Sequence, residues 1–368
     1  MRQHILMVGD KLSGLLKSES DIVHGGAELQ HITIVRSLVL KGWWVDILSS
    51  GCEVSEQWDG GQKWQIPLPW TRLDHLYKIY KSFRASTAEY CLAVGASPYV
   101  FVYATLSRLT QKKFVLSIQH DWDLAPDRMR IKGWRWVLYL LSLKFASQIV
   151  VQHEQQYQYA LQWTNRPICV LPNYLTFDIP ISCLPPGKSF LWVGTYRNYK
   201  RPEIVLDLAE RLPHEQFTLI CKPTHSDSST STMNSYRRQA YESLVVRANS
   251  LPNVVFMPGC SHTDVRKYIQ SCKALLITSE AEGWPNVLLE AATCGRATLS
   301  LNDVADQVIT KNELGFVAET IDNMVQIIEQ TTYLEWVRLG HNAHHYVRSQ
   351  YSNTELTGRL IKILQSIS

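Results

Sequence analysis

The sequence predicts an α/β protein built from two doubly wound, Rossmann-like halves. Apolar strand-like runs alternate with helical stretches such as 27–41, and this alternation favours parallel strands joined by crossover helices. The pattern is interrupted at 180–188, where proline and glycine break both periodicities, and it then restarts. A chain of 368 residues with 45% hydrophobic content has room for two domains.

The expected strands define the domain boundaries. In the first half they are 5–8, 43–48, 99–103, 114–118, 148–151 and 168–171, and in the second half they are 190–193, 217–220, 254–256, 274–278 and 297–301. We therefore place a first domain at 1–180, a linker at 181–188 and a second domain at 189–350. The C-terminal segment 351–368 contains a helical stretch that can cross back to the first domain.

Composition excludes several classes of protein. The net charge is only +4, with 37 basic and 33 acidic residues, and no nucleic-acid-binding motif is present, so we expect no nucleic-acid partner. The eight cysteines lack paired spacing and are expected to be small core residues in a reducing compartment. The apolar run 5–9 is too short for a signal peptide or a membrane span. We expect a cytoplasmic protein.

Two glutamates mark the most informative segment, 282–290, which reads Glu-Gly-Trp-Pro-Asn-Val-Leu-Leu-Glu. It follows the strand-like run 274–279, and ligands bind at this end of the strands in an open α/β sheet. Pro285 suits the first position of a helix, where its missing N–H costs nothing. Glu282 is therefore expected in a loop and Glu290 inside the helix that follows.

A basic loop opens the second half. The strand expected at 190–193 leads to Gly194, and the loop after it carries Arg197, Lys200 and Arg201 before a helix begins at Pro202. Glycine lets an anion approach the backbone, helix-start amides point toward it, and cations neutralise a diphosphate. The segment predicts a phosphate cradle. The alternative is an exposed, solvated basic loop.

The first half offers two further candidates. Gly25 and Gly26 precede a helix, where free amides can bind phosphate or sugar oxygens, although a turn with positive φ would have the same sequence. The spacing differs from the G-x-G-x-x-G fingerprint, so nicotinamide is not indicated. His120 ends a strand, where it can donate to a sugar hydroxyl or serve a structural role.

Two patterns resemble metal sites, yet we expect no metal. Asp121 and Asp123 form a D-x-D pair with no further oxygen ligands beside them. His341, His344 and His345 have helical spacing, but a solvated helix face is the better interpretation.

Two stretches combine aromatic and basic residues. Residues 128–145 contain five basic residues and no acidic one, and 70–84 interleaves lysine and arginine with tryptophan, tyrosine and phenylalanine. Interfacial helices anchor in this way, so an anionic membrane surface is a candidate partner. The alternative is a pair of amphipathic helices covering the first sheet.

Taken together, these residues resemble the retaining GT-B glycosyltransferases of family 4, which use nucleotide-diphosphate sugars. The likeness is carried by Gly25-Gly26-Ala27-Glu28, the His120-Asp121 strand end, Leu171-Pro172-Asn173, the loop 193–200, the segment 253–259, and 282–290 with the Ala-Ala-Thr-Cys-Gly that follows it. The resemblance implies two Rossmann-like domains facing a central cleft. The first would bind the acceptor and the second the nucleotide sugar.

The resemblance also implies roles for the acids and the lysine. Glu282 matches the acid near the donor sugar hydroxyls, Glu290 the acid that binds the ribose hydroxyls, and Lys200 the residue that holds the diphosphate. Carboxylates suit both roles because they accept hydrogen bonds from hydroxyls.

The chain departs from the family pattern in two places. The family usually has arginine where this chain has Thr195, so Arg197 or Arg201 is expected to supply the second phosphate cation. The family loop often reads Gly-Phe-Gly-Leu-Pro, whereas this chain has Gly-Trp-Pro-Asn, so the contacts that choose the sugar are expected to differ. The amides near Asn286 and Val287 are still expected to face the donor.

The activity implied by the resemblance is hexosyl transfer with retention and without a metal or cofactor. Glu282, His120 and Lys200 are the candidate catalytic residues, and the leaving phosphate helps to deprotonate the acceptor in a front-face attack. We expect a glycan or lipid-linked acceptor, and a role in cell-envelope or surface polysaccharide synthesis. If the basic helices attach to a membrane, we expect the protein on its inner face. A nucleotide-sugar epimerase, a phosphorylase or a non-catalytic sugar-binding scaffold remain alternatives.

Overall fold

The computed structural model describes residues 2–9, 26–49, 56–58, 60–65, 73–97, 99–125, 133–173, 185–223 and 232–367. These residues divide into two compact units. The first contains the described residues up to 173 together with 352–367, and the second contains those from 185 to 351. Of the predicted linker, 181–184 lie outside the described residues.

The first unit contains an eight-stranded sheet in the order β3-β4-β2-β1-β5-β6-β7-β8. Its strands are β1 (His4–Gly9), β2 (Trp44–Ser49), β3 (Glu56–Trp58), β4 (Gly61–Gln65), β5 (Tyr90–Val94), β6 (Lys113–Ser117), β7 (Gln148–Val151) and β8 (Ile168–Val170). The strands pair in parallel except for β3, which is antiparallel to β4. The order reverses beside β1, as in doubly wound sheets.

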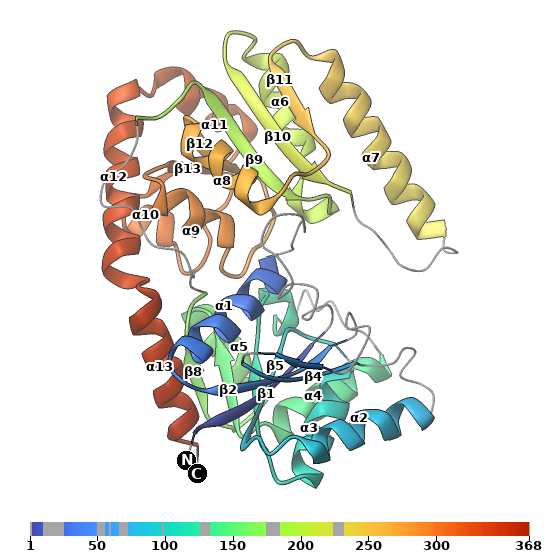
Figure 1. Ribbon diagram of the computed structural model, residues 1–368. Helices are drawn as coiled ribbons and strands as arrows, with labels where there is room; N and C mark the ends of the chain where they lie inside the picture. Colours follow the sequence, from blue (N-terminus) through green and yellow to red (C-terminus); the bar gives the residue numbers. More distant parts are fainter. Residues whose placement is uncertain are drawn as a thin grey trace. The chain divides into compact units, whose positions relative to one another are not determined.

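The helices of the first unit lie around this sheet (Figure 1). They are α1 (Gly26–Leu40), α2 (Leu73–Ala85), α3 (Tyr99–Leu109), α4 (Trp134–Phe145), α5 (Glu154–Leu161), the short 3-10 helix η2 (Asp121–Asp123) and the C-terminal α13 (Asn353–Gln365). Ser37 of α1 donates to the Asn353 side chain at 2.7 Å, and Arg359 donates to the Val170 carbonyl at 3.0 Å. These bonds attach the last helix of the chain to the first unit.

The prediction of a strand at 99–103 was wrong, because this segment begins α3. Its β-branched and aromatic residues favour a strand locally. The buried positions, however, are Val100, Tyr103, Ala104 and Ser107, which is the spacing of one helix face. The strand in this part of the sheet is β5, whose residues are almost all buried. Packing against the sheet therefore outweighs local strand propensity here.

The second unit contains a six-stranded, fully parallel sheet in the order β11-β10-β9-β12-β13-β14. Its strands are β9 (Ser189–Thr195), β10 (Gln216–Lys222), β11 (Val254–Met257), β12 (Ala274–Ile277), β13 (Ala297–Ser300) and β14 (Gly315–Val317). Its helices are α6 (Glu203–Arg211), α7 (Thr232–Ser250), α8 (His262–Ser271), α9 (Asn286–Thr293), α10 (Val308–Lys311), α11 (Ile321–Gln330), α12 (Tyr333–Gln350) and the 3-10 helix η3 (Asn198–Lys200). This is the Rossmann strand order.

Both cores form as the apolar patterns of the sequence predict. Strands β12 and β13 are buried throughout, as expected for parallel strands covered on both faces. In the second unit the core closes around Phe190, Phe217 and the fully buried Trp336 of α12. Two Rossmann-like α/β units with parallel sheets confirm the predicted fold class.

Candidate functional site

The strand order of the second unit brings two loops together. β9 and β12 are neighbours although they are distant in the sequence, and the strand order reverses between them. Both strands run in the same direction, so the loop that follows β9 and the loop that follows β12 leave the sheet at the same edge. Ligands of open α/β sheets bind at such a switch point.

Lys200 and Glu282 meet at this edge. Lys200 ends η3 in the loop after β9, and its Nζ donates to Oε1 of Glu282 at 2.8 Å. Ser279, which follows β12, donates from Oγ to the same oxygen at 2.6 Å. The two charged side chains are 24% and 12% exposed, so the pair is largely but not fully removed from water. A carboxylate accepts several hydrogen bonds, so Glu282 can hold Lys200 and also bind a sugar hydroxyl.

A relay of hydrogen bonds fixes the backbone that carries Lys200. The Trp192 indole Nε1 donates to Thr278 Oγ1 at 2.9 Å, and this hydroxyl donates to the carbonyl oxygen of Lys200 at 2.6 Å. The amide of Glu280 donates to the Tyr199 carbonyl at 2.8 Å. The two loops are thus bonded through their main chains as well as through the ion pair.

Gly194 is required by the same arrangement. A methyl group at this position would lie 2.9 Å from Cη2 of Trp192, closer than side-chain carbons approach one another. The Trp192 ring therefore covers the space that any larger residue at 194 would need. The glycine that the sequence suggested for approach of an anion also has a packing role.

The ammonium of Lys200 stays charged at neutral pH. Burial on its own disfavours the ammonium, but the Glu282 carboxylate and Tyr199 outweigh burial and raise the pKa of Lys200 above its ordinary value. The Arg197 guanidinium acts in the opposite direction, which places a second cation within electrostatic range of Lys200. Two cations, Lys200 and Arg197, therefore lie close together after β9, and one of them is paired with Glu282.

The other predicted phosphate-binding residues lie on the same loop. Thr195 is the last residue of β9, Arg197 precedes η3 and Arg201 follows it. Arg201 has φ of 51°, in the left-handed region that costs a non-glycine residue about 1 kcal/mol or more. Non-glycine residues held in this region cluster at functional sites. Here the turn redirects the chain from η3 into α6.

Glu290 lies inside α9, as the sequence predicts, and only 6% of it is exposed. Its Oε1 lies 3.2 Å from Nε2 of His262, the first residue of α8. Asn286 and Val287 are the first two residues of α9. Pro285 occupies the N-cap position of this helix, one position before the first helical position that the sequence predicted for it. Its side chain makes no capping hydrogen bond.

Trp284, in the loop between the two acids, faces away from solvent. Its ring stacks on Tyr351 with a centroid separation of 5.3 Å, and it is 7% exposed. Tyr351 is the last residue of the second unit. The loop that departs from the family pattern is therefore fixed by an aromatic contact with the end of α12.

The candidates of the first half belong to the other unit. His120 follows β6 and caps η2: its Nδ1 accepts from the Trp122 amide at 3.2 Å. Gly26 is the first residue of α1, and Gly25 lies outside the described residues.

Within the described residues, no group of three or more His, Cys, Asp or Glu side chains could hold a metal ion. Asp121 accepts hydrogen bonds from His153 and Gln156, each at 2.8 Å, so its carboxylate orders the end of β7 and α5. The expectation of a solvated face was wrong for His344, which is buried with Nδ1 3.0 Å from the Thr293 carbonyl.

Sequence reasoning missed Trp192, Thr278, Ser279 and His262. Thr278 and Ser279 follow β12 directly, and polar residues at the carboxyl end of a buried strand are a signal for a site. Trp192 and His262 carry no such signal. Their contacts depend on which strands are neighbours, and a single sequence does not give that order.

Comparison with known proteins agrees with this geometry. Residues 185–335 match the family model described as Glycosyl transferases group 1, a range that contains Lys200, Glu282 and Glu290. A search of curated protein sequences found no match.

Solved structures resemble the whole chain. The sucrose-phosphate synthase of Thermosynechococcus elongatus superposes with a TM-score of 0.77 at 17% identity, covering 100% of both chains. Anabaena HepE in complex with UDP-glucose gives 0.74 at 15% identity over 99% of this chain and 100% of that one. WaaG, described as a glycosyltransferase involved in lipopolysaccharide biosynthesis, gives 0.67 at 16% identity over 98% and 100%. The chain therefore has the GT-B fold, and its second unit carries the sequence pattern of group 1 glycosyl transferases, which supports a glycosyltransferase.

Proposed function

We propose that this protein is a retaining glycosyltransferase of family 4 that moves a hexose from a nucleotide-diphosphate sugar to a glycan or lipid-linked acceptor. The observation that carries the proposal is the contact of Lys200 with Glu282 at the switch point of the second sheet, 2.8 Å apart. A cation and a carboxylate at one site match the two halves of the donor. The diphosphate is anionic, and the sugar presents hydroxyl donors.

Each residue has a role that its chemistry permits. Lys200 binds the diphosphate and stabilises the charge that develops on it as the sugar leaves, with Arg197 or Arg201 as the second cation. Preorganised cations and dipoles aimed at the leaving group are usually the largest catalytic term. Glu282 orients the sugar hydroxyls, and Glu290 accepts from the ribose hydroxyls.

The reaction proceeds by front-face attack in this proposal. The bond from the anomeric carbon to the donor phosphate oxygen breaks, and the acceptor oxygen bonds to the same face of that carbon. The acceptor proton passes to the departing phosphate, so a protein nucleophile and a metal ion are not needed. His120 lies in the acceptor-binding domain, where it can donate to a sugar hydroxyl.

UDP-glucose is the first donor to assay, because the structure of a GT-B neighbour was determined with it. We expect slow donor hydrolysis by the purified protein and faster turnover once an acceptor is present, both unchanged by EDTA. NMR of the product should show the donor's anomeric configuration. Formation of an isomerised nucleotide sugar without any acceptor would indicate an epimerase. A requirement for free phosphate would indicate a phosphorylase, and donor binding without turnover would indicate a non-catalytic sugar-binding scaffold. Any of these results would contradict the proposal.

The proposed place of action is the cytoplasmic side of a membrane, in cell-envelope or surface polysaccharide synthesis. Among the residues that the structure describes, no helix combines the length and hydropathy needed to cross a bilayer. A lipid-linked acceptor would bring the enzyme to the membrane surface. Activity on a lipid-linked acceptor that exceeds activity on the same glycan without its lipid would support this assignment.

A further inference from the structure

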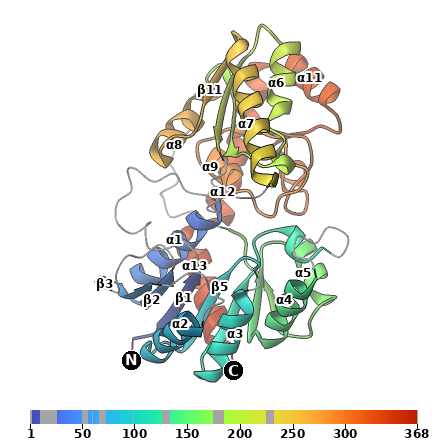
Figure 2. The same cartoon turned by 90° about the vertical axis from the view of Figure 1, so that its right-hand side faces the viewer.

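Three helices of the first unit form a continuous layer. Figure 2 shows α2, α3 and α4 side by side in front of the sheet. Phe83 of α2 stacks on Tyr103 of α3 with ring centroids 6.3 Å apart, and Phe101 of α3 lies 5.8 Å from the Phe145 ring of α4. Aromatic contacts therefore join the helices, and of these the contact between Phe83 and Tyr103 is buried. The sides of the helices that face away from the sheet form one outer face.

The outer face is strongly basic. The three helices carry six exposed basic residues: Lys78, Lys81, Arg84, Arg108, Arg135, at the first turn of α4, and Lys144. The only acidic residue on the three helices is Asp74. Six positive charges and one negative give these helices +5, whereas the whole chain is +4, which leaves −1 for all other residues. The net positive charge of the chain is thus carried by these three helices.

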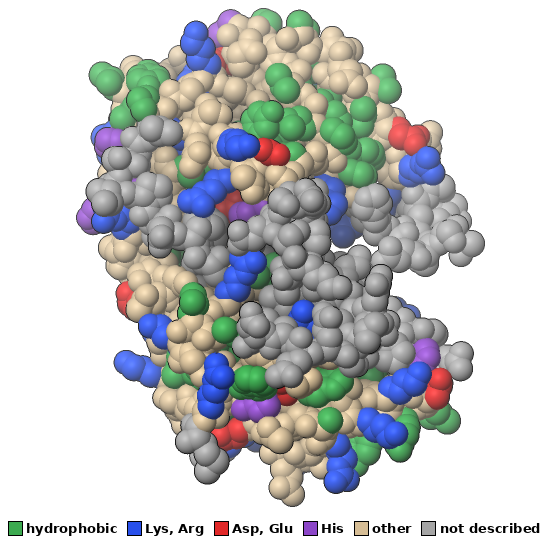
Figure 3. Space-filling view, in the orientation of Figure 1, with side chains coloured by type: hydrophobic (Ala, Val, Ile, Leu, Met, Phe, Trp, Pro, Cys, Tyr) green, Lys and Arg blue, Asp and Glu red, His purple; other side chains and the backbone are tan. Residues whose placement is uncertain are grey.

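The basic side chains are available for a partner. All six are exposed, and none forms an ion pair with another described residue. On α2 the exposed positions 77, 78, 81 and 84 follow one helical stripe, opposite the buried Ile79 and Phe83. Figure 3 shows blue side chains grouped with green ones at the lower right, where Figure 1 places α2.

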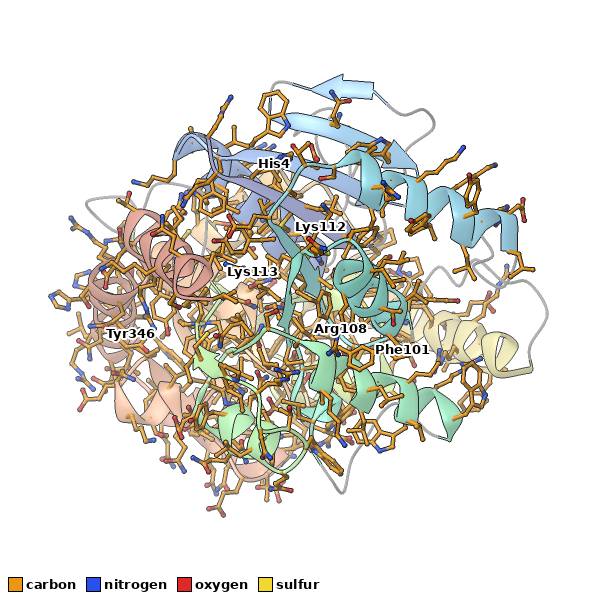
Figure 4. All side chains as sticks on the ribbon, turned by 90° about the horizontal axis from the view of Figure 1, so that it is seen from below. His4, Phe101, Arg108, Lys112, Lys113 and Tyr346 are labelled. Carbon is orange, nitrogen blue, oxygen red and sulfur yellow. The ribbon has the colours of Figure 1, made fainter. Side chains whose placement is uncertain are left out.

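Large exposed apolar side chains lie between the basic residues of α2 and α4. Leu73 is 84% exposed, Trp134 67%, Tyr77 57% and Val137 55%. The Lys81 ammonium lies 4.8 Å from the Tyr77 ring centre, and the Arg135 guanidinium lies 5.6 Å from that of Trp134. Arg108 likewise lies over the Phe145 ring at 5.1 Å, and Figure 4 labels it where α3 meets α4.

We infer that the outer face of α2, α3 and α4 docks on an anionic lipid bilayer. Tryptophan and tyrosine occupy the headgroup region, where the ring is partly buried and its polar edge stays wet. Lysine and arginine beside them bind lipid phosphates and neutralise the negative surface potential. The exposed leucine, valine and tryptophan side chains between the charges supply apolar area that inserts below the lipid headgroups. The inference goes beyond the donor chemistry and does not rest on it.

The test is sedimentation of the full chain with vesicles. We expect binding to vesicles of phosphatidylcholine mixed with phosphatidylglycerol, weak binding to phosphatidylcholine alone, and release by salt because the attraction is screened. Each positive charge near an anionic surface contributes a factor of about five in partitioning. The double variant Lys78→Glu/Lys81→Glu should therefore bind at least about 25-fold more weakly.

A matched control is available on α7 of the second unit. The variant Arg237→Glu/Arg238→Glu makes the same change in net charge at exposed positions, and it should bind like the wild type. Trp134→Ser should also weaken binding, whereas Leu334→Ser, at a leucine that is 76% exposed on α12, should not.

Three results would overturn the inference. They are equal losses in the two charge-reversal variants, equal binding to the two kinds of vesicle, and binding to soluble dextran sulfate as tight as to anionic vesicles. Circular dichroism spectra that match the wild type would show that each variant is folded. Because donor turnover is measured separately, failure of this inference leaves the proposed enzyme activity untouched, and failure of that activity leaves this inference untouched.

Discussion

Replacement of Lys200 by methionine should separate a loss of ligand binding from a loss of stability. The change removes the ammonium that donates to Glu282 at 2.8 Å and leaves a carboxylate that is only 12% exposed with one cation fewer. Breaking a fully buried pair costs about 3–5 kcal/mol. Lys200 is 24% exposed, so solvent screening reduces this figure, and we expect a loss of about 1–2 kcal/mol in the free energy of unfolding.

The same substitution should weaken nucleotide binding strongly. A hydrogen bond to a charged group contributes about 1.5–3 kcal/mol, which corresponds to about a 10-fold to 150-fold rise in the Kd of a nucleoside diphosphate. The affinity for the matching nucleoside, which has no phosphate, should stay the same. Isothermal titration calorimetry with both ligands measures this difference.

Lys273→Met is the matched control. Lys273 pairs with Glu215, also at 2.8 Å, and the two side chains are 15% and 18% exposed. The pair lies in the same unit but at the amino ends of β12 and β10, away from the candidate site. This variant should lose at least as much stability and keep the wild-type Kd. The reasoning would be refuted if both variants kept the wild-type Kd for the nucleoside diphosphate, or if both bound it equally weakly.

The ion pair also predicts a dependence of stability on pH. The pKa of Lys200 is raised in the folded protein above the ordinary 10.5. The contribution of the pair is therefore fully present below the unfolded pKa and is lost as pH rises through the folded pKa. The difference in stability between the wild type and Lys200→Met should be constant around neutral pH and should shrink only above about pH 10.5.

Substitutions at four further positions test the rest of the site. Glu290→Ala should raise the Kd of the nucleoside as well as that of the nucleoside diphosphate. His262→Ala should raise both by a smaller factor, and His262→Asn should restore part of the lost affinity. Unchanged nucleoside affinity in these variants would contradict the assignment of the ribose site. Gly194→Ala should lower the free energy of unfolding by about 1–3 kcal/mol because its methyl group meets the Trp192 ring, and urea denaturation would show no loss if the ring moves aside freely. Arg201→Gly relieves the positive φ, so stability should hold or rise while diphosphate affinity falls; retained affinity would exclude Arg201 as the second cation.

The sequence was sufficient for the fold class because its apolar runs are strongly patterned. β12 is a short continuous apolar run, and the structure buries it completely, as it does β13, in which apolar residues alternate with Thr298 and Ser300. Where the pattern is ambiguous, tertiary packing decided the outcome. The segment 99–103 favours a strand locally but forms a helix, and the three-residue β14 is too short to show a period.

The site was predictable only residue by residue. The types and spacing of Lys200 and Glu282 indicated a phosphate-binding cation and a sugar-binding acid, but nothing in the sequence gives the contact between residues 82 positions apart. That contact arises because β9 and β12, which are distant in the sequence, are neighbours in the sheet. The proximity of His262 to Glu290 depends in the same way on how α8 packs against α9.

A crystal structure of the protein with a bound nucleoside diphosphate tests the central claim most directly. We expect a diphosphate oxygen within hydrogen-bonding distance of Lys200 Nζ, and the ribose hydroxyls at the carboxylate of Glu290. A nucleotide bound elsewhere, with neither residue in contact with it, would contradict the account.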